Sequence, residues 1–176
     1  LKQLPIEFRA LTSLTKMDVS GNPLYSPPKE VVKQECSGIR YLAALAQANK
    51  NGKLDLSAMK LRDMPDDNNR LKDVTAMHLK GHQLRGIPEA ISYFSSLKTL
   101  SAENNELIAV SPKISDLASL STLNLDNNLL SSLPDSLRKL TLLMRLSLMD
   151  NQFPGVPNAV GVLTRLRQLN MSGNSI

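Results

Sequence analysis

The chain repeats itself every 23 residues. Apolar side chains recur at the first, fourth, sixth and eleventh positions of each copy, as in Leu120, Leu123, Leu125 and Leu130. An early copy begins at Leu14, and six more follow one another at a constant interval from Asn51, Val74, Leu97, Leu120, Leu143 and Leu166. One such coil cannot bury its own apolar face, so the copies have to stack into an elongated solenoid.

The alternation of side chains within each copy predicts a short strand. In one copy, Leu123 and Leu125 are expected to point into the core. Thr122, Asn124 and Asp126 are then expected to point outward. In the stacked coils, these outward positions form a concave surface that a partner can contact.

The ninth position of five copies is asparagine. A buried side-chain amide can donate to and accept from backbone groups that a turn leaves unpaired. We therefore predict a structural ladder of stacked amides, and loss of one rung is expected to cost about 1–3 kcal/mol. Its rungs are Asn22, Asn105, Asn128, Asn151 and Asn174.

The back of each coil is predicted from proline and from apolar residues three apart. Leu133 is followed by Pro134, and Val156 is followed by Pro157. Proline fixes the turn toward the convex side. The spacing that follows, exemplified by Leu137 and Leu140, favours a short 3₁₀ or irregular helical turn behind the sheet.

The repeat is interrupted once. After Leu14 the next start is expected at residue 37, but it falls at Asn51, 14 residues later. Apolar residues at spacings of three and four predict an amphipathic helix within residues 29–49, ended by Asn51 and Gly52. The predicted stripe is Val32, Cys36, Ile39, Leu42 and Ala46.

This interruption divides the chain into three parts. We assign residues 1–28 to the end of a first repeat block, 29–50 to a helical insertion or junction, and 51–176 to a second block truncated in its last repeat. Further coils are expected on one or both sides. The insertion is interpreted either as a tolerated element packed on the convex side or edge, or as a helix that hinges the solenoid or touches a partner.

The two coils after the interruption depart from the ladder. Met59 and His82 stand where their neighbours have asparagine. We interpret His82 as a substitute hydrogen-bonding side chain in preference to a pH sensor or a ligand. The acidic and amide run at residues 66–69 lacks the regular oxygen spacing of a calcium loop and is interpreted as a polar turn.

The assembled pattern, L-x-x-L-x-L-x-x-N-x-L followed by L-P-x-x-L-x-x-L, resembles the leucine-rich repeats of cytosolic scaffold proteins, including the Ras-group class. The resemblance implies an α/β solenoid with a curved parallel sheet in front and short helical turns behind. It also implies binding of another protein, with small GTPases, phosphatase subunits and cytoskeletal proteins as typical partners. Residues 84–88 alone resemble the repeats of plant receptor ectodomains.

Composition excludes several classes of protein. One cysteine, Cys36, permits no internal disulfide and favours a reducing, cytoplasmic location. No apolar run approaches the ~20 residues of a membrane span. The net charge of +5 comes from dispersed basic residues with few aromatics, which disfavours nucleic-acid binding. The sequence Asn170-Met171-Ser172 fits a glycosylation signal and is interpreted as chance.

No residue pattern predicts catalysis. The chain has two histidines and no G-x-S-x-G, phosphate loop, paired cysteine motif or H-E-x-x-H. We therefore expect no enzyme activity, cofactor, metal or small-molecule substrate.

The outward positions of the regular coils remain as the candidate binding site. The early coils offer a mixed, mildly basic surface that includes Lys16, Asp18, Lys53, Asp55, His78 and Lys80. The later coils offer an acidic, amide-rich surface with one exposed methionine, a pattern typical of an adaptable contact inside a polar rim. We call this second surface the concave patch: Ser101, Glu103, Asn104, Asn124, Asp126, Asn127, Met149 and Asp150.

Our functional hypothesis is a non-catalytic interaction module of an intracellular scaffold or regulatory protein, with a basic partner docked on Glu103, Asp126, Met149 and Asp150. The alternative is that these residues have no binding role and form an ordinary solvated strand surface. Two other functions stay open: a permanent structural subunit of a cytoskeletal or axonemal assembly, and a receptor ectodomain.

Overall fold

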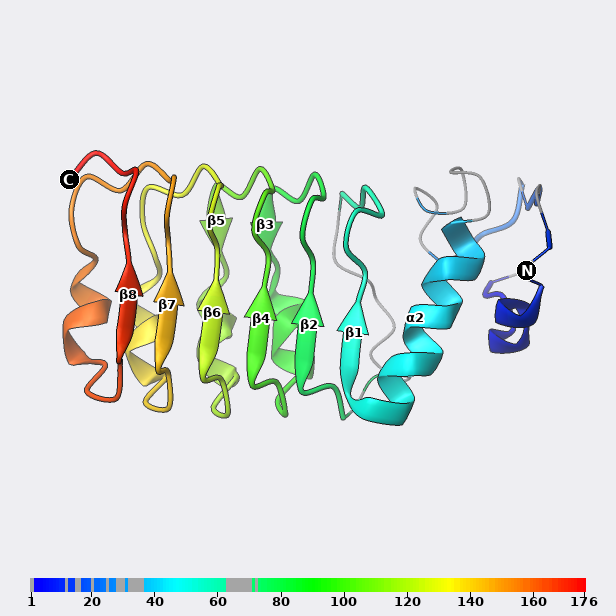
Figure 1. Cartoon of the computed structure of the whole chain (residues 1–176), viewed down its shortest axis with the longest axis horizontal. Helices are drawn as coiled ribbons and strands as arrows, with labels where there is room; N and C mark the ends of the chain where they lie inside the picture. Colours follow the sequence, from blue (N-terminus) through cyan, green and yellow to red (C-terminus); the bar gives the residue numbers. More distant parts are fainter. Residues whose placement is uncertain are drawn as a thin grey trace.

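The computed structural model is a single row of stacked coils (Figure 1). It describes residues 2–11, 13, 14, 17–19, 21–24, 26, 27, 31, 37–62, 71 and 73–176. The predicted positions Lys16, Val32, Cys36 and 66–69 lie outside the described residues.

One face of the solenoid is a six-stranded parallel sheet in the order β1-β2-β4-β6-β7-β8. Each register step is one repeat, so Leu100 pairs with Leu123 and Leu123 pairs with Leu146. The predicted leucine-rich-repeat solenoid is thereby confirmed. Its strands are β1 (Lys53–Asp55), β2 (Ala76–His78), β4 (Thr99–Ser101), β6 (Thr122–Asn124), β7 (Arg145–Ser147) and β8 (Gln168–Asn170).

The opposite face consists of short 3₁₀ turns, which confirms the prediction for the back of each coil (Figure 1). Proline precedes three of these turns, and in the fourth Ser111 accepts a hydrogen bond from the backbone N–H of Lys113 at 3.2 Å. Each turn buries at least one central aliphatic side chain against the sheet. The turns are η3 (Glu89–Tyr93), η4 (Pro112–Asp116), η5 (Asp135–Lys139) and η6 (Asn158–Val162).

A second, two-stranded sheet lies beyond the ends of the main strands and was not predicted. Its strands, β3 (Gly86–Ile87) and β5 (Ala109–Val110), pair in the same 23-residue register. An isolated bridge between Gln3 and Ser26 repeats this register near the N-terminus. The described N-terminal residues thus keep the coil geometry, although none of them adds a strand to the main sheet.

The helix α2 (Ser37–Asn51) lies beside β1 at one edge of the main sheet, between that strand and η1 (Ile6–Ala10) (Figure 1). It buries Tyr41, Leu42 and Leu45 completely.

The predicted helical stripe is correct at Ile39 and Leu42 but wrong at Ala46, which is only partly buried. The helix contacts both β1 and η1, so the buried stripe follows Leu45 and Ala48 instead. Gly52, with φ of +69°, ends the helix as expected.

Candidate protein-binding surface

The concave patch lies on the strand side of the solenoid, where coils stacked 23 residues apart bring equivalent positions together. Ser101, Asn124 and Asp126 are partly buried, and Asn104 and Asn127 are exposed. Met149, which we expected to be exposed, is partly buried, as Ser101, Asn124 and Asp126 are.

Asp126 is held in place by the backbone. Its carboxylate accepts a hydrogen bond from the Met149 N–H at 2.8 Å, and its own N–H donates to the Asn124 side chain at 2.9 Å. The first bond fixes the carboxylate and the second fixes the Asp126 backbone, and the carboxylate keeps further acceptor capacity. Among the described residues, no cationic group lies within 4.0 Å of Asp126 or Asp150.

Glu103 differs from Asp126 and Asp150 because a cation already lies near its carboxylate. Its carboxylate lies 4.0 Å from the Lys80 ammonium and accepts a hydrogen bond from the Ser101 hydroxyl. Only 18% of the side chain is exposed. Neighbouring side chains on the strand surface therefore already supply Glu103 with partners, and the negative charge available to an incoming protein resides mainly on Asp126 and Asp150.

The eighth position of every coil adopts a left-handed backbone conformation. Asn104, Asn127 and Asp150 have φ between 51° and 56°, the equivalent position of three other coils is glycine, and that of the remaining coil is Ala58 with φ of 60°. Gly adopts this conformation at the lowest energetic cost, and Asn and Asp adopt it more readily than other residues. The turn thus favours Asn and Asp at three positions of the concave patch, and all three are exposed.

The Asp150 side chain also occupies the space above the next turn. A methyl group built on Gly173 would overlap the Asp150 carboxylate, so this glycine leaves room for the acid of the preceding coil. Asp150 is therefore placed by packing as well as by its backbone.

The asparagines of the regular coils form the expected network. The Asn128 side-chain oxygen accepts from the Leu107 N–H at 3.0 Å, and its nitrogen donates to the carbonyls of Ala102 and Leu125 at 3.1 and 2.9 Å. Asn105, Asn151 and Asn174 make the equivalent bonds one coil apart. The described bond of Asn22 is to the Val19 carbonyl, at 3.1 Å.

His82 takes the place of a rung. Its Nδ1 accepts from the Leu61 N–H at 3.0 Å, the bond that asparagine oxygen makes elsewhere. The ring is 95% buried, and within the described residues its Nε2 has no hydrogen-bond partner. Burial lowers the His82 pKa to about 4, while the Leu56 carbonyl and the Asp55 carboxylate oppose this shift. His82 is thus neutral at pH 7.

The early coils carry charges of both signs on the strand side. Partial burial raises the pKa of Asp55, but hydrogen bonds from Ser57 and the nearby charges of His78 and His82 together bring it below its usual value. Lys53 and Lys80 are exposed. This surface is mixed, as expected from the sequence.

No group of three or more potential metal ligands occurs among the described residues. Among the same residues, no helix has the length and apolarity that a bilayer span requires.

Comparisons with known proteins agree with the repeat architecture. Residues 118–176 match the family model described as leucine rich repeat. No curated protein sequence matches the chain. A leucine-rich-repeat protein of Leptospira interrogans is similar in structure, with a TM-score of 0.61 and 28% identity over 74% of this chain and 40% of its own.

Two further solved structures are similar. The internalin inlF of Listeria monocytogenes has a TM-score of 0.58 and 26% identity, over 65% of this chain and 32% of its own. The plant peptide hormone receptor RGFR1, solved in complex with RGF2, has a TM-score of 0.53 and 34% identity, over 59% of this chain and 17% of its own. This chain spans less than half the length of each of the three proteins. Domains of this repeat class generally mediate protein–protein interaction and are typically non-enzymatic.

Proposed function

We propose that the chain is a non-catalytic module of a cytoplasmic scaffold or regulatory protein, and that it binds a basic surface of another protein on the concave patch. The observation that carries this proposal is the pair of carboxylates Asp126 and Asp150, which lie one coil apart on the strand side without a cation near either of them in the described part of the chain. A small GTPase, a phosphatase subunit or a cytoskeletal protein is a suitable partner type.

Rigidity supports the proposal. Asp126 is fixed by two hydrogen bonds, and the amide network beneath it joins each coil to the next. A surface that is ordered before binding loses little conformational entropy when a partner docks, so more of the interaction energy appears as affinity. Complementary charge additionally raises the association rate and discriminates against acidic proteins.

The experiment is affinity capture with mass spectrometry, comparing wild type with Asp126→Asn/Asp150→Asn. Asparagine retains the acceptor that Met149 needs and tolerates the left-handed turn at position 150, so the variant removes charge without disturbing the fold. The control is Asp116→Asn/Asp135→Asn, which removes the same charge from the convex side. We expect a protein retained by wild type and by the control to be lost by the first variant. Equal capture by all three would exclude the concave patch.

A permanent structural subunit is the second candidate, and exposed apolar side chains outside the patch favour it. Tyr93 and Val162, both on the convex turns, are 62% and 50% exposed, and Ile108 is 61% exposed. A subunit of a large assembly would cover such side chains. Co-purification of the native protein in one complex that survives high salt would support this function over a transient scaffold interaction.

A peptide-binding ectodomain is the third candidate, favoured by the 34% identity to the plant receptor. Asn170, which begins the glycosylation signal, is exposed on β8. A mass shift of the native protein after enzymatic deglycosylation would support this candidate and contradict a cytoplasmic location.

A further inference from the structure

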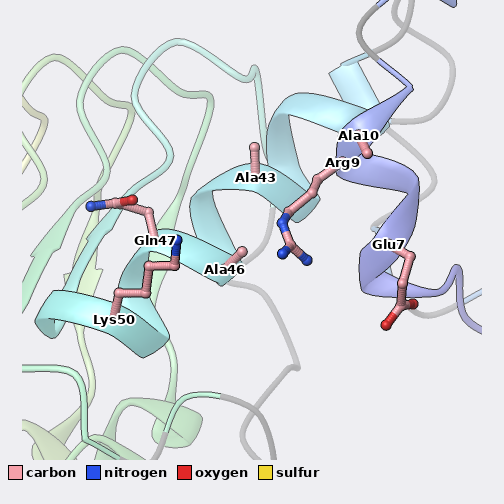
Figure 2. Close-up of a pocket in the computed structure, with 7 residues that line it drawn as sticks. All are labelled: Glu7, Arg9, Ala10, Ala43, Ala46, Gln47 and Lys50. Atoms are coloured by element: carbon pink, nitrogen blue, oxygen red, sulfur yellow. The ribbon is translucent and has the colours of Figure 1, made fainter.

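A groove separates the two elements at the N-terminal end of the solenoid. It lies between η1 and α2 and encloses about 470 Å³ (Figure 2). Both sides of the groove contribute small or polar side chains. Those that bear on its chemistry are Arg9 and Ala10 from η1, and Ala43, Ala46, Gln47 and Lys50 from α2.

The side chains on the floor of the groove are short. Ala10, Ala43 and Ala46 present only methyl groups, so a guest main chain can approach the two elements closely. Gln47, on the wall, offers an amide that can donate to and accept from a peptide group. These features suit a polypeptide segment better than a bulky planar ligand, because none of the described residues that line the groove is aromatic and available for stacking.

Two of the described side chains that line the groove, Arg9 and Lys50, are positively charged, and Glu7 is negatively charged. Figure 2 shows the Arg9 guanidinium directed between the two elements, whereas the Glu7 carboxylate points away from it. Within the described residues, no carboxylate lies within 4.0 Å of Arg9 or Lys50. The one hydrogen bond described for the Arg9 guanidinium is its 3.3 Å bond to the Ile6 carbonyl.

The rest of the outer face of α2 also carries positive charge. Arg40, Ala43, Gln47 and Lys50 follow one another at spacings of three and four, and all four are exposed. No acidic residue occurs anywhere in α2. An incoming acidic segment would therefore meet no like charge along α2, and Glu7 is the one acid among the described residues that line the groove.

We propose that this groove binds an acidic, small-residue segment of another protein, with its carboxylates on Arg9 and Lys50 and its main chain over the three alanines. The proposal does not depend on the concave patch, which lies on later coils and carries the opposite charge. It gives the inserted helix a role in binding as well as in covering the edge of β1.

The test is fluorescence anisotropy on the full chain with a labelled peptide of alternating glutamate and alanine. We expect saturable binding that weakens with salt, and no binding of the matched peptide in which glutamine replaces glutamate. The double variant Arg9→Gln/Lys50→Gln should weaken binding about tenfold, because both counter-charges are lost. No saturable binding of the glutamate peptide by wild type would overturn the proposal.

Two further variants separate the groove from general electrostatics. Arg138→Gln/Lys139→Gln removes the same charge from η5 and should leave affinity unchanged. Ala43→Tyr fills the groove from an exposed position and should abolish binding while leaving the charge and the circular dichroism spectrum intact. Equal loss in the η5 variant, or unchanged affinity in Ala43→Tyr, would overturn the proposal. Tighter binding of a single-stranded oligonucleotide at the same residues would also contradict it.

Discussion

The coil that contains His82 and the coil that contains Asn128 solve the same structural problem with different side chains. Each rung accepts the backbone N–H of the residue 21 positions earlier, at 3.0 Å in both cases. Asn128 also donates to three carbonyls, whereas the His82 Nε2 reaches no acceptor among the described residues. The acceptor is thus the part of the rung that both side chains share, and the donor adds stability to the regular coils.

Removal of the complete rung should have the largest effect. Asn128→Ala leaves the Leu107 N–H buried without a partner, whereas the three carbonyls keep other donors, and we expect a loss of about 3 kcal/mol in the free energy of unfolding. Urea denaturation followed by circular dichroism measures it. A loss under about 1 kcal/mol would mean that water replaces the amide and that the ladder contributes little.

The second largest effect is expected from acid, which should destabilise the early coils. The unfolded chain protonates His82 near pH 6.5, whereas the folded chain does so only near pH 4. Between these values the unfolded state holds more protons, so stability falls as pH is lowered through this window, by about 3 kcal/mol in total. Thermal denaturation at pH 7, 5 and 4 checks the expectation.

His82→Asn is the matched control for this pH dependence. It restores a rung that does not titrate, so the stability loss between pH 6.5 and 4 should largely disappear. The lowered pKa of Asp55 acts only below its usual value of 3.8 and does not overlap with this window. An unchanged pH profile in the variant would assign the acid sensitivity to another group.

Glycine at the end of α2 should matter more than glycine in a coil turn. Gly52→Ala places a methyl group 3.0 Å from the Thr75 hydroxyl in a left-handed conformation, and we expect a loss of about 2 kcal/mol. Gly81→Ala has the same backbone strain but open space around it, so its loss should be about 1 kcal/mol. Equal losses in urea denaturation would show that the contact with Thr75 is unimportant.

The smallest effect on stability is expected from the Lys80–Glu103 ion pair, which joins neighbouring coils. Lys80→Gln removes the partner of Glu103 at a position where the lysine is 57% exposed. The free energy of unfolding should change by less than about 0.5 kcal/mol, because solvent screens such pairs. A larger loss in the same assay would show that Glu103 needs this counter-charge to remain folded against the strand.

Much of the fold follows from the 23-residue register in the sequence. The same register contained two signals that we missed. Lys80 and Glu103 are one repeat apart, which places them side by side, and Gly81, Asn104 and Asn127 share the eighth position, which is typical of a left-handed turn. Both could have been predicted.

Other features could not be predicted from the register. The β3 and β5 strands are two residues long and leave no alternating pattern. The partial burial of Met149 and the groove beside Ala43 depend on how neighbouring elements pack, which no local spacing specifies.

Hydrogen exchange of the backbone amides tests the central claim most directly, because it observes both kinds of rung in one molecule. The Leu61 amide reports on His82, and the Leu107 and Leu130 amides report on asparagine rungs. We predict that the Leu61 protection factor falls about twentyfold between pH 7 and pH 5, while the other two stay nearly constant. Equal changes at all three amides would contradict the claim that the rung sets the stability of each coil.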